Sequence, residues 1–394
     1  MAQADHPYDA IILGAGAAGM MAAAVAGRNG VRVLLADHAD EPGKKILISG
    51  GGRCNFTNVH AAPDRFLSAN PHFARSALAR YTPADFIALV DGYRIAWHEK
   101  TLGQLFCDGS ARQVVTMLRN ECAGGGVGWS LGRPVDAIDH ADGQFRVRIG
   151  RDTAIAPKLV IATGGPSIPQ MGATGFAYDV ARRFGLKVVE PRPALVPLTL
   201  GGDEALFKTL SGVSSEVIAS AGKGRFREAA LFTHRGLSGP AILQVSSYWR
   251  HGEAVAIDFT PDRPDGWLVE QKRLHPRMGV QSVLGQTLSG RLAEALADRL
   301  ALPGNLADLT DKALATAEAR LAAWPFNPNG TEGFMKAEVT IGGVATDTLS
   351  QQTFEAKAVP GLHFIGECVD VTGWLGGYNF QWAWASAVAC GKSL

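Results

Sequence analysis

Near its start, the chain changes abruptly from a hydrophobic run to a mixture of glycine and alanine. Ile11, Ile12 and Leu13 predict a buried strand, and the alanine-rich stretch after them predicts a helix that extends to about Gly30. A second apolar run, residues 31–36, follows this helix. Strand, helix and strand in this order predict a βαβ unit with parallel strands.

Farther along, hydrophobic periodicity predicts a succession of further elements. We expect helices at residues 83–90, 110–122, 175–184 and 240–249, and strands at residues 145–149, 158–163, 338–341 and 361–367. The last of these strands is expected to be a further central strand of a sheet. An apolar helix that ends near Gly391 is expected to follow it.

The pattern of hydrophobic and polar residues in the middle of the chain differs from that at both ends. Residues 194–260 read mostly as strands broken by glycines, whereas residues 264–324 read as helical and charged. Two apolar stripes, at 283–300 and 309–324, support helices in the second stretch. Strands and then helices in this order predict insertions into one α/β domain.

We place the domain boundaries where this hydrophobic pattern changes. The α/β domain is expected to comprise residues 1–193 and 335–394, with a β-rich insertion at 194–263 and a helical insertion at 264–334.

Composition narrows the class of protein. The 394 residues are 46% hydrophobic, and 38 Lys and Arg against 37 Asp and Glu leave a net charge of +1. This balance provides no global field that would attract nucleic acid or anionic lipid. The start of the chain lacks the basic and apolar regions of a signal peptide, and glycines interrupt the apolar run at residues 10–26. We therefore expect neither a signal peptide nor a membrane span.

Cysteine and histidine spacing offers no metal site. The cysteines are scattered, without a CxxC pair, at Cys54, Cys107, Cys122, Cys368 and Cys390. The ten histidines show no HExxH-like spacing. Reduced thiols in a cytoplasmic protein, with no bound metal, are the expectation.

The glycines after the first strand have the spacing of a dinucleotide-binding turn. Gly14 permits a tight turn, Gly16 allows the backbone to approach a pyrophosphate, and Gly19 allows close packing of helix and sheet. Asp37 follows Gly19 by 37 − 19 = 18 residues. An acid at about this distance binds the ribose hydroxyls of an adenine dinucleotide, so the turn predicts such a cofactor.

Other glycine-rich segments carry many hydrogen-bond donors. Residues 43–58 contain three consecutive glycines beside Ser, Arg, Asn and Thr, a backbone that can wrap closely round a ligand. The strand at 158–163 stops at Gly164-Gly165, as expected where a cofactor crosses the carboxyl edge of a sheet. Residues 366–381 run into the last helix, whose N-terminus directs a positive dipole at the preceding loop.

Together these segments resemble the bacterial flavoprotein family of the YhiN/BaiN type. The resemblance is carried by Gly14–Gly19, Gly43–Asn58, Ala162–Gly165, Thr233–Pro240 and Gly366–Gln381, which span nearly the whole chain. It implies a Rossmann-like, glutathione-reductase-type FAD-binding domain made from both ends of the chain, with β-barrel-like and α-helical subdomains inserted. It also implies an oxidoreductase that reduces activated C=C bonds, with uracil in ribosomal RNA and steroid-like acids as candidate substrates. Cys368 departs from the family pattern, and no role is assigned to it.

The residues themselves also favour FAD over NAD as the resident cofactor. The chain has a single strand-glycine-helix-acid fingerprint, which leaves no second unit for a dedicated NAD(P)H domain. FAD is longer, and its flavin end requires a second docking segment, which residues 366–381 can supply. We expect Asp370 to bind a ribityl hydroxyl, and the amides near Tyr378 and Asn379 to face the flavin N1 and C2 carbonyl.

The expected cofactor contacts come from these glycine-rich segments and the residues beside them. The candidates are Gly14, Gly16, Ala17, Ala18, Gly19, Asp37, His38, Lys45, Ser49, Gly50, Gly51, Gly52, Arg53, Cys54, Asn55, Thr57, Ala162, Thr163, Gly164, Gly165, Gly366, Glu367, Asp370, Gly376, Gly377, Tyr378, Asn379, Phe380 and Gln381.

Four side chains are candidates for donating a proton or polarising the substrate: Cys54, Arg53, Tyr378 and His234. Each has a structural alternative. Cys54 can pack beside the flavin, Arg53 can neutralise phosphate, Tyr378 can stack and His234 can cap a turn.

We carry three hypotheses for function. The first is a two-electron flavoenzyme in which NAD(P)H or another donor reduces FAD, and flavin N5 passes hydride to an electron-poor substrate. The second is an RNA-modifying flavoenzyme that reduces uridine to dihydrouridine in ribosomal RNA. The third is a flavin-binding module or redox sensor without turnover. Small-molecule and RNA substrates both stay open, no membrane partner is expected, and the oligomeric state is not predicted.

For the second hypothesis, basic residues of the insertions are the candidates for holding RNA. They are Lys223, Arg225, Arg227, Arg235, Lys272, Arg273 and Arg277. The alternative is a solvated surface with acidic neighbours, which the balanced charge of the chain favours.

Overall fold

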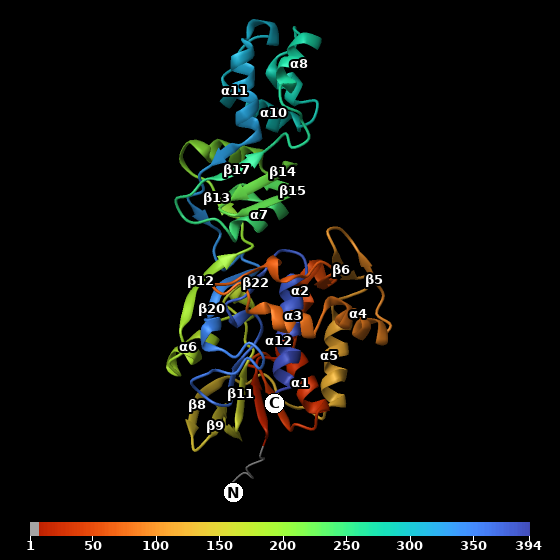
Figure 1. Cartoon of the computed structure of the whole chain (residues 1–394), viewed down its shortest axis with the longest axis vertical. Helices are drawn as coiled ribbons and strands as arrows, with labels where there is room; N and C mark the ends of the chain where they lie inside the picture. Colours follow the sequence, from red (N-terminus) through yellow and green to blue (C-terminus); the bar gives the residue numbers. More distant parts are fainter. Residues whose placement is uncertain (1–7) are drawn as a thin grey trace. The chain divides into compact units, whose positions relative to one another are not determined.

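The computed structural model describes residues 8–394 and divides them into two compact units (Figure 1). The first unit combines the chain up to Arg192 with Val339–Leu394, and the second unit is Pro193–Glu338. This division does not test the domain boundaries expected from the sequence, which stay predictions. The expectation of no signal peptide concerns the start of the chain, of which residues 1–7 lie outside the described part.

A parallel β-sheet lies at the centre of the first unit, with strand order β21-β11-β1-β2-β7. Its strands are β1 (Ala10–Leu13), β2 (Val33–Ala36), β7 (Gly128–Ser130), β11 (Lys158–Ile161) and β21 (Leu362–Phe364). Ile11 pairs with Leu34 on one side and with Leu159 on the other, and all three side chains are buried. Strands covered on both faces read as continuous apolar runs, which is why the sequence identified β1, β2 and β11.

Helix α1 (Ala17–Arg28) is the predicted helix of the βαβ unit, and it is buried on most sides. It packs against the last helix, α12 (Tyr378–Gly391), and against α5 (Arg112–Gly124). Glycines allow the backbones to approach: a Cβ on Gly391 would lie 2.8 Å from the Ala22 carbonyl oxygen, and one on Gly27 would lie 2.3 Å from the Gly125 carbonyl oxygen. The two ends of the chain therefore form one core.

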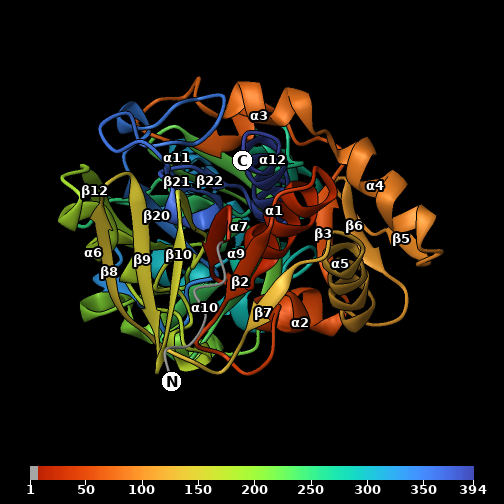
Figure 2. The same ribbon diagram turned by 90° about the horizontal axis from the view of Figure 1, so that it is seen from below.

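Small antiparallel sheets and short helices complete the first unit. One sheet contains β8, β9 and β10, which lie side by side in yellow in Figure 2; a second contains β3, β6 and β5. Their bounds are β3 (Asn55–Asn58), β5 (Trp97–Glu99), β6 (Gln104–Cys107), β8 (Val135–Ala141), β9 (Gln144–Ile149) and β10 (Asp152–Ala156). Two strand pairs are β4 (Phe66–Leu67) with β22 (Thr372–Gly373) and β12 (Val188–Ala194) with β20 (Val339–Val344). The helices are α2 (Lys44–Ile48), α3 (Ala74–Arg80), α4 (Pro83–Gly92) and α6 (Phe176–Arg183).

The prediction of a central strand at 361–367 is wrong in one respect: β21 is an edge strand of the parallel sheet. Its residues are nevertheless fully buried. The edge is covered by the segment before it, in which Glu355 forms an antiparallel bridge to His363. A covered edge has the same apolar pattern as a central strand, so the sequence could not distinguish them.

In the second unit, an antiparallel sheet has the strand order β18-β17-β14-β15-β16-β13-β19. The strands are β13 (Leu198–Thr199), β14 (Ser214–Ala221), β15 (Gly224–Phe232), β16 (Gly236–Ser238), β17 (Val255–Asp258), β18 (Trp324–Phe326) and β19 (Gly330–Thr331). The helices are α7 (Pro240–Ser246), α8 (Trp267–Leu274), α9 (Val280–Leu284), α10 (Gly290–Leu300) and α11 (Asp311–Ala322). The chain thus returns from the helices to the same sheet.

The apolar stripe at 283–300 belongs to two helices and not to one. Helix α9 ends at Leu284, and α10 begins at Gly290. The break contains Gly285 and Thr287, residues with low helix propensity, while Leu288 remains buried and continues the apolar stripe.

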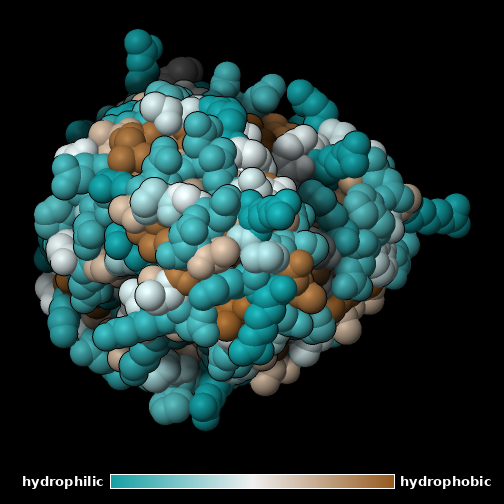
Figure 3. Space-filling model, turned by 90° about the horizontal axis from the view of Figure 1, so that it is seen from above, coloured by the Kyte–Doolittle hydropathy of each residue, from teal (hydrophilic) through white to brown (hydrophobic). Residues whose placement is uncertain are grey.

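The described surface shows no membrane-spanning element. No helix within residues 8–394 is long and apolar enough to cross a membrane. The face in Figure 3 is mostly hydrophilic, and its hydrophobic residues are scattered in small groups.

Candidate cofactor site

The predicted dinucleotide turn has the steric features that its glycines imply. Gly14 has a φ of 106° and lies so close to the end of β11 that a Cβ would meet the Ala162 carbonyl oxygen at 2.5 Å. A Cβ on Gly19 would lie only 1.7 Å from the Gly14 carbonyl oxygen. By contrast, a Cβ on Gly16 would have no neighbour within 4 Å. Gly14 and Gly19 are therefore required by the fold, whereas Gly16 faces open space.

Asp37 directly follows β2, beside this turn. One of its carboxylate oxygens accepts a hydrogen bond from the Ala15 amide at 2.6 Å, and the other accepts one from the Ala39 amide at 2.8 Å. These bonds fix the carboxylate at the carboxyl edge of the sheet, next to the start of α1. The sequence predicted this position from spacing alone.

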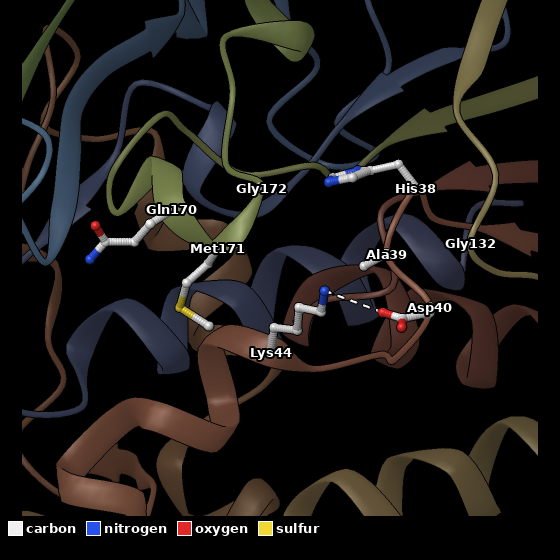
Figure 4. Close-up of a pocket in the computed structure, with 8 residues that line it drawn as sticks. All are labelled: His38, Ala39, Asp40, Lys44, Gly132, Gln170, Met171 and Gly172. Carbon is white, nitrogen blue, oxygen red and sulfur yellow. Dashed lines mark ion pairs between the residues drawn. The ribbon is translucent and has the colours of Figure 1, made fainter.

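A cavity of about 500 Å³ opens immediately beyond Asp37 (Figure 4). It is lined by His38, Ala39, Asp40, Lys44, Gly132, Gln170, Met171 and Gly172. Lys44 and Asp40 form an ion pair of 3.3 Å on its wall. Its volume lies in the usual range for small-molecule sites. It adjoins the acid that was expected to bind ribose, so the expected place for an adenosine group is next to it.

Glu367 joins four separate segments of the first unit. Its carboxylate accepts hydrogen bonds from Lys45 Nζ at 2.7 Å, from Ser167 Oγ at 2.9 Å and from the Thr340 amide at 3.0 Å. Glu367 therefore positions Lys45, a candidate contact, and Ser167, which the sequence analysis did not select.

In the described part of the first unit, three buried hydroxyls have no hydrogen-bond partner: those of Thr163, Tyr178 and Thr340. A Cβ on Gly165 would lie 2.7 Å from Thr340 Oγ1 and 2.8 Å from the Tyr178 hydroxyl, so these two groups face the same glycine. Burial, with Glu367 nearby, raises the pKa of Tyr178 and keeps it a neutral donor. Buried polar atoms are ordinarily hydrogen-bonded, so these hydroxyls indicate a place for a ligand or ordered water.

The segments Asn55–Asn58 and Gly376–Gln381 bind directly to each other. Thr57 Oγ1 donates to Gln381 Oε1 at 2.6 Å, and both residues are fully buried. Asn58 Nδ2 donates to the Gly376 carbonyl at 2.8 Å, and Gln381 Nε2 donates to the Tyr81 carbonyl at 2.9 Å. Polar residues expected to contact a cofactor thus hold β3 against the start of α12.

The other polar residues of these two segments are placed as follows. The side-chain amides of Asn55 and Gln104 lie 3.1 Å apart. Asn379 accepts from the Gly373 amide at 2.8 Å and donates to its carbonyl at 3.0 Å, so it fixes the turn before α12. Tyr378 is buried with its ring centroid 6.1 Å from that of Phe66. Phe380 is half-buried and stacks on Trp384 at 5.6 Å.

The triple-glycine loop adopts a left-handed backbone. Gly50, Gly51, Gly52 and Cys54 have φ values of 57°, 66°, 85° and 51°. Gly51 is exposed with open space where a Cβ would be, and Arg53 is also exposed. Ser49, another candidate contact, donates a hydrogen bond from its Oγ to the Ile46 carbonyl at 2.7 Å.

Cys54 and Cys368 are both completely buried. Burial raises the pKa of each thiol, that of Cys368 to about 12. Cys368 Sγ donates to the Ile365 carbonyl at 3.1 Å and lies 3.5 Å from the carbonyl oxygen of Ile161, the last residue of β11. Neither thiol reaches solvent in the described structure.

Asp370 is buried beside β22, where one carboxylate oxygen accepts from the Ala69 amide at 2.9 Å. Burial raises its pKa from 3.8 to about 6, although this hydrogen bond opposes the shift. The folded state therefore binds the proton more tightly than the unfolded state, and stability is lost as the pH rises from about 4 to about 6.

We expect Asp370→Asn to remove this pH dependence. The free energy of unfolding of the variant, relative to the wild type, should rise by about 2 kcal/mol between pH 4 and pH 6 and then level off. Urea denaturation across this pH range measures it. A constant difference between the two proteins would show that folding does not raise the pKa of Asp370.

The structure places the remaining candidates in or beside these groups. Ala17, Ala18 and Ala162 adjoin the glycine turn, and the Gly366 amide donates to Ser386 Oγ at 3.0 Å. His234 is exposed in the second unit, in the turn between β15 and β16. No group of three or more His, Cys, Asp or Glu side chains within residues 8–394 is arranged to hold a metal ion.

Sequence reasoning missed Ser167, Tyr178 and Thr340 and much of the lining of the cavity. Ser167 follows the Gly164-Gly165-Pro166 turn, and that position could have identified it. Gln170 and Met171 follow Ile168, which has a left-handed φ of 59°, and no local pattern indicates that they return to the end of β2.

The chain matches the model of the HI0933-like protein Rossmann domain over residues 8–393. It is 52% identical over 396 residues to a ribosomal RNA dihydrouridine synthase of Escherichia coli, with 98% of each chain covered. It is 28% identical to a 3-dehydro-bile acid delta(4,6)-reductase of Clostridium scindens, over 97% of this chain and 98% of that protein. The apo form of the Mycobacterium smegmatis Sdh1 complex shares the fold, with a TM-score of 0.50, 17% identity and coverage of 99% of this chain and 68% of that one.

These matches confirm the resemblance to the YhiN/BaiN type and the Rossmann-like fold class of an FAD-binding domain. The chain belongs to the HI0933-like Rossmann family and is a flavoprotein of the FAD-dependent oxidoreductase class.

Proposed function

We propose that this protein reduces the C5=C6 bond of uridine in ribosomal RNA to give dihydrouridine. The observation that carries the proposal is the 52% identity to a ribosomal RNA dihydrouridine synthase across 98% of both chains. Because the match covers nearly all of both chains, each compact unit has a counterpart in that relative. The second of the three hypotheses thereby becomes the leading one.

The chemistry of uracil defines what the site must do. The C5=C6 bond is conjugated with the C4 carbonyl, so hydride adds at C6 and a proton is delivered to C5. FAD, when bound, supplies hydride transfer from N5 of its reduced ring, with NAD(P)H as the proposed transient donor of electrons. The protein must hold the cofactor, orient the base and provide the proton.

The residues of the first unit fit such a cofactor. The open space at Gly16 and the free amides at the start of α1 suit a diphosphate, and Asp37 suits the ribose. The neighbouring cavity of about 500 Å³ suits adenine. The unpartnered hydroxyls of Tyr178 and Thr340 can donate to polar atoms of the ligand.

The start of α12 is the proposed second docking segment. The helix N-terminus presents free amides and a positive dipole end, which stabilise negative charge on the pyrimidine part of a flavin. Asn379 fixes the preceding turn, and the contacts of Thr57 and Gln381 hold this helix start in place. Asn379, Thr57 and Gln381 therefore hold the proposed docking segment in position.

Arg53 and Tyr378 are the proposed sources of the proton or of substrate polarisation. Arg53 is exposed beside the triple-glycine loop, and Tyr378 begins α12. Cys54 has no exposed surface, and we propose that it packs within the loop. His234, in the second unit, also stays a proposed source of the proton or of substrate polarisation.

The test compares ribosomal RNA from cells with and without the gene. Loss of a dihydrouridine in the deletion strain, and its restoration when purified protein with FAD and NADH or NADPH is added to that RNA, is expected. Mass spectrometry of nuclease fragments measures the gain of two hydrogen atoms. RNA that is identical in both strains, together with no conversion in vitro, would contradict the proposal.

A small-molecule enone is the second candidate substrate. It is favoured by the match to a bile acid delta(4,6)-reductase over 97% of this chain. Reoxidation of the reduced flavin by a 3-oxo-4-ene steroid, but not by RNA, would support it. A flavin that neither nicotinamide nucleotide reduces would favour a module without turnover.

A further inference from the structure

In the second unit, we propose that four basic residues at one end of the sheet form a surface that binds the phosphate backbone of RNA. They are Lys223 and Arg225 on the β14–β15 hairpin, and Arg250 and His251 in the loop between α7 and β17. We call them the hairpin-tip patch. RNA as the partner rests on the proposed function, whereas the patch itself is a feature of the structure.

Two segments distant in sequence meet at this end of the sheet. A Cβ on Gly224 would lie 2.5 Å from Tyr248 Cδ2, and one on Gly222 would lie 3.5 Å from the Tyr248 carbonyl oxygen. Strand β17 pairs with β14, with Ala256 opposite Ser220. The loop that carries Arg250 and His251 connects Tyr248 to β17, so it lies beside the tip of the hairpin.

The four side chains are exposed, and no acidic side chain within residues 8–394 forms an ion pair with any of them. Three of the other basic residues expected to hold RNA are paired: Arg227 with Glu216 and with Asp262 at 2.8 Å each, Arg235 with Glu332 at 3.5 Å, and Lys272 with Asp311 at 2.9 Å. Arg273 and Arg277 are exposed and form no ion pair within residues 8–394. The structure thus divides the basic residues expected to hold RNA into a neutralised group and an available one. Lys223 and Arg225 belong to the available group.

The composition of the patch favours phosphate over an apolar partner. None of the large hydrophobic side chains exposed within the described residues belongs to it. Lys223 stands between two glycines at the tip of a hairpin, which lets a bulky polyanion approach closely. Lys223, Arg225 and Arg250 form no ion pair within residues 8–394, and Arg250 also donates a hydrogen bond to the Trp249 carbonyl at 3.3 Å. Cationic groups of this kind release counterions when they contact nucleic-acid phosphates, which makes such binding favourable and dependent on salt.

The experiment measures binding of full-length FAD-loaded protein to protein-free ribosomal RNA from a strain lacking the gene. Filter binding at a series of KCl concentrations compares the wild type with Lys223→Ala/Arg225→Ala/Arg250→Ala. We expect affinity to fall about 100-fold near 0.1 M salt, and the slope of log K against log salt to decrease in magnitude by about 2. The matched control is Arg146→Ala/Arg148→Ala/Arg151→Ala, which removes three exposed arginines from the β9–β10 hairpin of the first unit.

The outcomes separate this inference from the proposed function. Equal losses in both triple variants, or no RNA binding by the wild type, would overturn the inference. Patch-dependent binding without formation of dihydrouridine supports the surface and contradicts the proposed function. Flavin absorbance and melting temperature confirm that the variants are folded. If the triple variant does not fold, Lys223→Glu at the exposed tip provides the same comparison.

Discussion

Replacing Gly16 with alanine is expected to weaken FAD binding about 100-fold without lowering the stability of the apoprotein. No atom lies within 4 Å of the position that the new Cβ would take, and the φ of Gly16 is −83°, which alanine adopts readily. The cost therefore appears only when a diphosphate approaches the backbone. Loss of one or two charge-assisted hydrogen bonds, at about 1.5–3 kcal/mol each, corresponds to this change in affinity.

The matched control is Gly19→Ala, which adds the same methyl group to the same turn. Here the Cβ would lie 1.7 Å from the Gly14 carbonyl oxygen, so helix α1 must move away from β1. We expect a loss of about 3 kcal/mol or more in the free energy of unfolding of the apoprotein.

Two measurements on each variant distinguish these effects. Fluorescence titration of the deflavinated protein with FAD gives the affinity, and urea denaturation of the apoprotein gives the stability. If Gly16→Ala binds FAD as tightly as the wild type does, the diphosphate does not lie on this turn.

Replacing Gln381 with alanine is expected to lower the free energy of unfolding by about 3 kcal/mol. Its side chain is fully buried, accepts from the fully buried Thr57 Oγ1 and donates to the carbonyl of the half-buried Tyr81. Truncation leaves both groups without a partner and creates a cavity, and each unsatisfied buried group costs about 1–3 kcal/mol. The β3 segment should also become more mobile relative to α12, with weaker FAD binding as a consequence.

A double-mutant cycle with Thr57→Val tests the contact between the two motifs. Because valine has nearly the shape of threonine, the cycle isolates the hydrogen bond from packing, and we expect a coupling of about 1–2 kcal/mol. Urea denaturation of the four proteins measures it. Additive effects would mean that the two side chains act independently of each other.

Much of the fold follows from local patterns in the sequence. The apolar runs of β1, β2 and β11, the alanine-rich α1 and the glycines between them specify the βαβ unit, because the buried positions of each element carry apolar side chains. The position of Asp37 also follows from spacing, since a strand and a helix of defined length separate it from the turn. The helices at α4, α5, α6 and α12 were predicted for the same reason.

The candidate site was predicted less completely. The motif residues were all expected to face the cofactor, but Thr57 and Gln381 are buried partners of each other across 324 positions of sequence. Their polar character suggested ligand contact, because a buried hydrogen bond and a ligand contact require the same side chains. Tyr178 and Thr340 reach Gly165 from separate elements, and no spacing rule connects them.

By itself, the sequence determined the family, the glycine turn after β1 and the position of Asp37 beside it, because these depend on short-range geometry between neighbouring elements. The tertiary structure decided which polar residues face each other and which remain available. It paired Arg227 with Glu216 and Asp262 while leaving Lys223 exposed, and it placed the buried β21 at the edge of the sheet. The physical reason is that burial, pairing of charges and strand order depend on contacts between segments far apart in the chain, which local hydrophobic patterns do not encode.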